Sequence, residues 1–317
     1  MEWMVAAFLF WVLQQLAKSH PLSKPFTLKP SEKWKSPIDI IYPKLHLPLH
    51  RRKRSIRSDD NSLLVLRTTN DTFYIKLKPN EDLVEPNRLK ISSNPSQNSC
   101  HYHGTVLSHK QGTAAISICG PQNKMSGVIV SGKNAYVLRP MDHLSLEHLP
   151  DNLRNSSYLG KGAHIIMKMD NPMDQYCGGE HKIVSPHEST GETFGKKRIR
   201  RSSSDSELRK VIETAIYVDY PLYHKLSVKK KQSVAEMQDT ILAILNEVQL
   251  IYNYQSLKTK FKIVVIKLEI ISEGKEGPDA ADGDIDLYLD NFCSWQSSKN
   301  PPINSELHWD HALMLSG

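Results

Sequence analysis

The residues best suited to chemistry are the four cysteines, at positions 100, 119, 177 and 293. Cys177 stands in the stretch MDQYCGGE, residues 173–180, with two glycines after it and no other thiol nearby. A lone cysteine of this kind has two interpretations: a thiolate that binds a metal ion, or one half of a structural disulfide. Four cysteines allow three disulfide connectivities, and the sequence alone does not choose among them.

The segment from Cys100 to Cys119, CHYHGTVLSHKQGTAAISIC, favours one of these pairings. Its strand-forming residues and central turn residues have the pattern of a hairpin. A bond across this hairpin would stabilise the fold by about 3 kcal/mol through its effect on the unfolded state. The pairing leaves Cys177 and Cys293, which then either bond to each other or leave the Cys177 thiolate to bind a metal ion.

Two clusters of basic residues have the pattern that proprotein convertases of the furin type accept, with basic residues at P4, P2 and P1. The clusters lie in stretches rich in Pro, Gly or Ser, where a protease reaches the chain. The alternative is a solvated charge run, or a patch for an anionic partner such as a sulfated glycosaminoglycan. The candidate processing residues are Arg51 and Arg54 in the first cluster and Arg198, Arg200 and Arg201 in the second.

The first residues have the pattern of a secretory signal peptide, which we predict over 1–19. The apolar run at 5–16 is too short to span a bilayer, and a small-x-small sequence ending at Ser19 follows it. Glu2 and the lack of Lys or Arg before the run favour the alternative, a buried N-terminal helix. No later segment reaches the roughly 18 apolar residues of a membrane helix, so we expect a secreted product without a membrane span.

Secretion leads to further expectations about modification and partners. Asn70 and Asn155 each begin an Asn-x-Ser/Thr sequence and are predicted to carry N-glycans. The formal net charge is +7, but the excess lies in short runs rather than across one face. We therefore predict no nucleic-acid partner.

Changes in residue pattern divide the chain after the signal peptide. Residues 20–61 are rich in Pro, Lys and Ser without a sustained period, and they predict a flexible leader. Residues 62–168 hold short runs of strand-forming residues between turn residues, which predict a mostly β domain. Residues 169–201 lose this pattern and predict a linker.

Residues 202–317 predict an α/β layer. In the longer of its two helices, apolar residues recur at steps of three and four, which places them on one helical face. The order strand-helix-strand-helix-strand implies a largely parallel sheet, which we expect to be incomplete at residue 317. The predicted elements are strands at 211–218, 261–271 and 311–315 and helices within 227–252 and 282–296.

Three stretches resemble a known family of proteases. CHYHGTVLSHKQGTAAISIC, followed by MSG at 125–127, resembles the propeptide of the ADAM and ADAMTS metalloproteases. LYLDNFCSWQ at 287–296 and HWDHALMLSG at 308–317 are similar to segments in the amino-terminal half of their catalytic domain, and they favour ADAMTS. The resemblance covers most of residues 62–317. It implies a mostly β propeptide domain followed by an incomplete α/β metzincin-like catalytic domain.

The resemblance also implies roles for single residues. Cys177 resembles the propeptide cysteine that caps the catalytic zinc as its fourth ligand and displaces the attacking water. Glu213 and Asp310 resemble positions that bind a structural Ca²⁺ through carboxylate oxygens; the alternative is two ordinary charged residues at strand ends. Cys293 resembles a cysteine that bonds a partner further along the chain.

The implied function is that of a secreted zinc metalloendopeptidase zymogen that acts on proteins of the extracellular matrix or the cell surface. The family's signature HExxHxxGxxH occurs nowhere in the sequence, so the chain as given is expected to lack the catalytic zinc site and to be inactive. The main rival is a secreted prodomain-like protein that binds or inhibits a full-length protease without catalysis. A third hypothesis is a prohormone precursor cut at Arg54 and Arg201.

Overall fold

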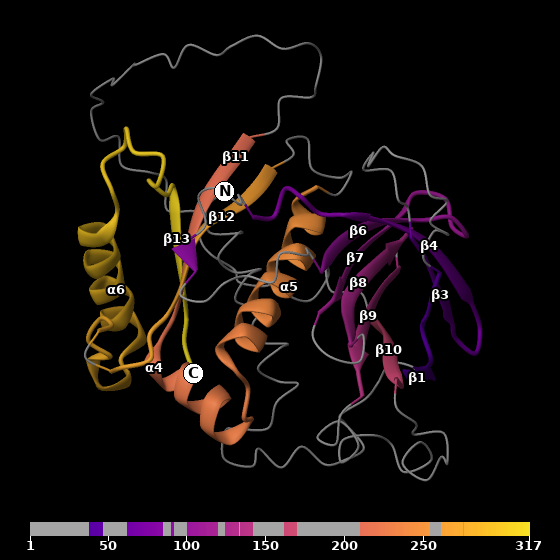
Figure 1. Cartoon of the computed structure of the whole chain (residues 1–317), viewed down its shortest axis with the longest axis horizontal. Coiled ribbons are helices and arrows are strands. Elements are labelled where there is room, and N and C mark those ends of the chain that lie inside the picture. The colour runs from indigo at the N-terminus through magenta and orange to yellow at the C-terminus, as the bar shows by residue number, and fades with distance from the viewer. Residues whose placement is uncertain are drawn as a thin grey trace, which may run out of the picture.

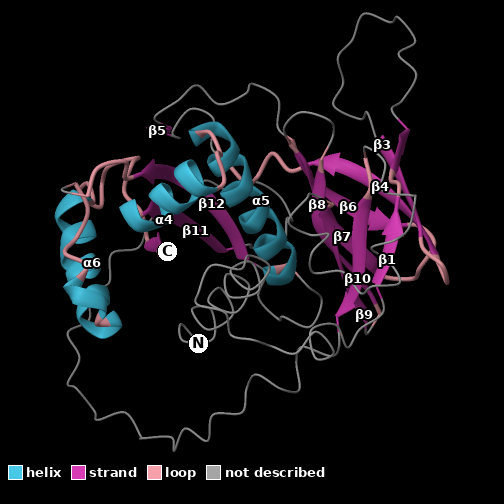
Figure 2. Ribbon diagram, turned by 90° about the horizontal axis from the view of Figure 1, so that it is seen from below, coloured by secondary structure: helices cyan, strands magenta, loops and turns pink. Residues whose placement is uncertain are grey.

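Two β-sheets with a long helix between them form the architecture of the computed structural model (Figures 1 and 2). The predicted signal peptide, both basic clusters and most of the predicted linker lie outside the described residues. Within the described part of the chain, no helix has the length and apolar character needed to cross a membrane. The structure describes residues 38–46, 62–84, 90–91, 100–119, 124–132, 134–141, 162–169, 210–253, 261–274 and 276–317.

The first sheet is antiparallel throughout, with nine strands in the order β1-β10-β9-β8-β7-β6-β4-β3-β2. Buried and more exposed side chains alternate along β4 and β8, as expected for a sheet with one face on a core. This confirms the mostly β prediction for this part of the chain. The strands are β1 (Ile38–Ile41), β2 (Lys44–His46), β3 (Ser62–Arg67), β4 (Thr72–Pro79), β6 (His101–Val106), β7 (Gly112–Ile118), β8 (Met125–Ser131), β9 (Asn134–Pro140) and β10 (His164–Met169).

The first sheet begins earlier in the sequence than predicted. Strands β1 and β2 lie within 20–61, the expected flexible leader. They form the two edges of the first sheet. Ile41 of β1 is only 2% exposed and belongs to the core, and Leu45 of β2 packs against the same cluster. Strands of three or four residues are too short to show a period in the sequence, yet they pair readily with an existing edge. The prediction of a flexible leader is therefore wrong for residues 38–46.

The second sheet is parallel, with the strand order β13-β11-β12-β5. It confirms the predicted order of strand, helix, strand, helix and strand in residues 202–317. The strands are β5 (Lys90–Ile91), β11 (Lys210–Val218), β12 (Phe261–Ile270) and β13 (His311–Leu315), and the helices are α4 (Tyr220–His224), the π-helical turn η3 (Lys225–Lys229), α5 (Val234–Tyr252), the 3₁₀ turn η4 (Ala281–Gly283) and α6 (Ile285–Lys299).

Helices α5 and α6 cover opposite faces of the second sheet (Figure 1). Alternate residues of β11 show this division, because side chains of a strand point to its two faces in turn. Ile216 belongs to the core cluster that holds Ile241 and Leu245 of α5. Tyr217 belongs to the cluster that holds Phe292 of α6. The result is a three-layer arrangement of helix, sheet and helix.

One edge of the second sheet is built from the N-terminal part of the chain. The two residues of β5 pair in parallel with Lys267 and Leu268 of β12, and Val84 forms a further parallel bridge with Val265. Next to that bridge, the Val265 amide donates a hydrogen bond of 3.0 Å to the carbonyl of Leu83. A segment predicted to belong wholly to the β domain therefore completes the α/β layer.

Candidate functional site

Two groups of described residues offer atoms that ligate metal ions. Glu213 and Asp310 present carboxylates in the second sheet, and Cys100, His101 and Cys119 lie together in the first sheet. Carboxylate oxygens suit Ca²⁺, whereas thiolate sulfur and imidazole nitrogen suit Zn²⁺. The geometry of each group decides whether it fits the ion that the family resemblance implies.

Glu213 and Asp310 lie side by side where β11 and β13 begin to pair. The parallel register places Thr214 opposite His311, so the residues before them are neighbours. The Asp310 amide donates to the Glu213 carbonyl at 2.9 Å, and the Glu213 amide donates to Asp310 Oδ2 at 3.1 Å. Asp310 is exposed and Glu213 is half-buried. Two neighbouring acidic residues fit a Ca²⁺ site in part, because that ion takes roughly six to eight oxygens and needs further ligands.

Cys100 and Cys119 form a disulfide that joins the ends of β6 and β7, the pairing that the hairpin pattern favours. Their Cα atoms are 5.2 Å apart. Ring nitrogens of His101 lie 3.7 Å from the sulfur of Cys100 and 3.9 Å from that of Cys119. Because both sulfurs belong to the disulfide, neither is a thiolate that could hold Zn²⁺. This cluster does not fit the zinc of a metalloprotease.

His101 is a buried, uncharged neighbour of the disulfide. Its Nδ1 lies 2.9 Å from the hydroxyl of Ser117. Burial lowers the pKa of His101 to about 4, because a protonated ring would lose its hydration inside the sheet. The imidazole is therefore neutral at physiological pH.

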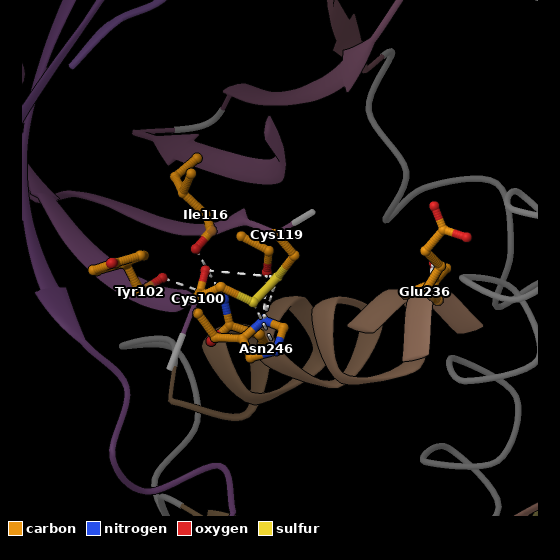
Figure 3. The surroundings of a disulfide bond; sticks show 9 residues. Cys100, Tyr102, Ile116, Cys119, Glu236 and Asn246 are labelled. Atoms are coloured by element: carbon orange, nitrogen blue, oxygen red, sulfur yellow. Dashed lines mark hydrogen bonds between the residues drawn. A yellow bond between two sulfur atoms is a disulfide. The ribbon is translucent and has the colours of Figure 1, made fainter. Parts of the chain in front are cut away.

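Helix α5 packs against the same hairpin, and Figure 3 shows Asn246 close to the disulfide. The Asn246 side-chain amide donates to the carbonyls of Tyr102 at 3.2 Å and Ile116 at 3.5 Å. The disulfide thus fixes a strand pair on which the helix docks. The role of Asn246 is not visible in the sequence, because a single Asn in a helix carries no signal of a partner more than a hundred positions away.

The other predicted site residues are only partly placed. Asn70 is exposed between β3 and β4, a position that a glycan can reach. Cys293 is a free, exposed cysteine on α6. Cys177 and Asn155 lie outside the described residues, as do the arginines of both basic clusters.

Comparison with known proteins gives one consistent result, although no family model matches the chain. It is 23% identical over 296 residues to "A disintegrin and metalloproteinase with thrombospondin motifs 15" of Mus musculus, covering 84% of this chain and 29% of that protein. It is 22% identical over 301 residues to "A disintegrin and metalloproteinase with thrombospondin motifs 1" of Rattus norvegicus, covering 86% of this chain and 30% of that protein. A third relative, "A disintegrin and metalloproteinase with thrombospondin motifs adt-1" of Caenorhabditis elegans, is 22% identical. The match covers 78% of this chain and 19% of that protein. The chain thus spans less than a third of the length of these relatives.

Proposed function

Because this chain is an ADAMTS-type protein by similarity over 78% to 86% of its length, we propose that it holds the propeptide and the amino-terminal part of the catalytic domain of a secreted zinc metalloendopeptidase. The extent of the similarity is the observation that best supports this proposal, since it must include parts of both sheets. The proposed substrates are proteins of the extracellular matrix or the cell surface.

In this proposal the first sheet and β5 belong to the propeptide of a zymogen, and β11, β12 and β13 belong to its catalytic part. Residues 1–19 are the signal peptide, and the β-rich propeptide includes 38–46 as well as 62–168. A furin-type convertase cuts after Arg201, in the linker 169–201, and leaves 202–317 as the start of the mature protein. The change from an antiparallel to a parallel sheet across this linker supports the division.

The metal requirements of the proposal differ for zinc and calcium. The residues of this chain do not supply the zinc site, because HExxHxxGxxH is absent and the cluster at Cys100 is a disulfide. We therefore assign no catalytic step to this chain. When a catalytic zinc is present, the proposed role of Cys177 is to occupy its open position with sulfur and exclude water. Glu213 and Asp310 are proposed ligands of a structural Ca²⁺.

Processing in a secretory cell tests the zymogen part of the proposal. The chain is expressed with and without a furin-type convertase, and the product is identified by N-terminal sequencing. We expect a fragment that begins at Ser202, and an Arg201→Ala variant should not yield this fragment. An Arg54→Ala variant, which changes the first basic cluster, is the matched control and should still yield this fragment. A wild-type chain that remains uncut in the presence of the convertase would contradict the proposal.

The second candidate is a secreted binding protein that inhibits a full-length protease, a role in which Cys177 would bind the zinc of that protease and no HExxHxxGxxH of its own is needed. Its test adds the purified chain to an active metalloproteinase with thrombospondin motifs and measures peptide hydrolysis. Inhibition that disappears in a Cys177→Ser variant would support this candidate. Equal hydrolysis with and without the chain would leave the zymogen proposal as the better one.

A further inference from the structure

Helix α5 carries polar residues on the side that faces the first sheet. Asn246, Glu247 and Gln249 are almost fully buried, with exposed fractions of 0%, 4% and 2%. The helix lies between the two sheets in both views (Figures 1 and 2), and it contacts β6, β7 and β8 as well as β12. Buried polar groups of this kind are costly unless each finds a partner. Their partners in the first sheet therefore define how the two parts of the chain fit together.

A charged pair forms the first contact. Arg139 of β9 donates from Nη1 to Glu247 Oε1 at 2.8 Å and from Nη2 to Oε2 at 3.0 Å, a bidentate arrangement. The same guanidinium also donates to the carbonyls of Gly127 at 3.2 Å and Leu138 at 2.8 Å. The guanidinium is thus bonded to carbonyls of its own sheet as well as to the carboxylate. Such preorganised forks are selective for a carboxylate at one position.

A set of amides forms the second contact. The Asn80 side chain, which follows β4, donates to Asn246 Oδ1 at 2.8 Å and to Gln249 Oε1 at 2.7 Å. His103 Nε2 of β6 lies 3.2 Å from the Asn246 carbonyl. Gln249 in turn donates to the Ile263 carbonyl of β12 at 3.4 Å. The amide set therefore links the first sheet, α5 and the second sheet.

The third contact is the pairing of Val84 and of the two residues of β5 with the edge of β12. Leu83 is 1% exposed and lies in the core cluster of the second sheet. An ion pair of 2.8 Å between Lys262 and Asp82 closes the start of this segment. Main-chain pairing at a sheet edge gives affinity, while the side chains beside it give specificity.

We propose that these three contacts make α5 and the β12 edge a docking surface selective for this chain's own N-terminal part, which stays bound without a covalent connection, and that Arg139 and Glu247 are its specificity pair. The inference rests on the proposed cleavage between the parts, because only a cut chain needs such retention. The occupant is the N-terminal part of the chain, which already contacts this surface through Asn80, Leu83 and Arg139 in the intact chain. A polar surface of this kind is wetted readily when uncovered, so it suits an interface between separable parts.

The charge pair carries selectivity because an unpartnered buried charge is strongly unfavourable. A bound part with another residue at position 139 would leave the Glu247 carboxylate buried without its partner. Reversing one charge places two like charges in contact and should weaken the complex by roughly a hundredfold or more. Reversing both charges restores opposite signs and should recover a part of the lost affinity.

The experiment uses the full chain with residues 198–201 replaced by the recognition sequence of a site-specific protease, so that it does not depend on a convertase. A Cys293→Ser background removes any covalent tether between the parts. After complete cutting, verified on a denaturing gel, size-exclusion chromatography and the dissociation rate report whether the two parts remain together. The variants are Arg139→Glu, Glu247→Arg, both together, and Lys76→Glu as a control on the exposed side of β4.

The expected result is co-elution of the two parts in the background and control chains, separation in each single variant, and co-elution restored in the double variant. Circular dichroism shows whether a charge reversal prevents folding. In that case Arg139→Lys and Glu247→Gln replace the reversals, and we expect them to raise the dissociation rate by about tenfold or more. Separation of the background chain on cutting would overturn the proposal. Unchanged dissociation in all variants would overturn the role of the charge pair. Neither result bears on whether a convertase cuts at Arg201, which the processing experiment decides.

Discussion

At the scale of single residues, His101 ties the stability of the first sheet to pH. Its folded pKa is about 4, against an ordinary value of 6.5. Between these pH values His101 is protonated in the unfolded chain and neutral in the folded chain. The full contribution of His101 to the free energy of unfolding is therefore present above pH 6.5, and it decreases as the pH falls towards 4. The expected loss at pH 4 relative to pH 8 is about 3 kcal/mol.

Denaturant unfolding between pH 8 and pH 4 measures this loss. A His101→Asn variant should show a shallower dependence over the same window. Burial also lowers the pKa of His164, so the variant should keep a part of the slope. Superimposable profiles for wild type and variant would contradict the assignment to His101.

The carboxylates at Glu213 and Asp310 lead to a prediction about calcium. If Ca²⁺ binds the folded chain alone, a concentration a hundredfold above the dissociation constant should stabilise it by about 2.7 kcal/mol. Thermal unfolding with Ca²⁺, and with a chelator, measures the shift. Asp310→Asn should abolish the response, whereas Glu306→Gln, a change at an exposed acidic residue nearby, should preserve it. A shift of the same size in both variants would place the ion elsewhere.

At the scale of elements, a capping box determines where α5 begins. The Ser233 hydroxyl accepts from the Glu236 amide at 3.3 Å, and the Ser233 amide donates to Glu236 Oε2 at 2.8 Å. These bonds also lower the pKa of Glu236, the backbone bond most of all. Ser233→Ala should cost about 1 kcal/mol of stability, measured by denaturant unfolding. Thr240→Ala, which removes a hydroxyl bonded within the helix, should be close to neutral; an equal loss there would contradict the capping argument.

How far the elements could be predicted follows from the range of the interactions that form them. The apolar face of α5 is visible in the sequence because Ile241 and Val248 recur at helical spacing and bury against the second sheet. The polar contacts of α5 with the first sheet cannot be predicted from the sequence, because Glu247 has the pattern of any solvated charge on a helix. Gly127, in the MSG stretch, shows the same limit. A side chain there would collide with the Ala115 carbonyl of β7, which only the pairing of β7 and β8 reveals.

At the scale of the whole molecule, the sequence predicts two layers of different type but not how they join. The two residues of β5 have no pattern of their own, and their place in the second sheet depends on a partner far along the chain. The metal-ligand candidates Glu213 and Asp310 came from family resemblance, since a register that makes them neighbours exists only once β13 pairs with β11. Pairing of distant segments is the information that local propensity lacks.

Joining of the two sheets through one helix predicts that the uncut chain unfolds in a single transition. Leu245 of α5 is part of the second core, while Asn246 next to it is bonded to the Tyr102 carbonyl of the first sheet. Calorimetry should therefore give equal calorimetric and van't Hoff enthalpies. Asn246→Ala removes the side-chain bonds of α5 to Asn80, Tyr102 and Ile116 and leaves buried partners unsatisfied, at a cost of about 2 to 3 kcal/mol. We expect the Asn246→Ala variant to unfold in two transitions. The control Asp290→Ala, at an exposed position, should unfold in a single transition. Two transitions in the wild type would show that α5 does not couple the sheets.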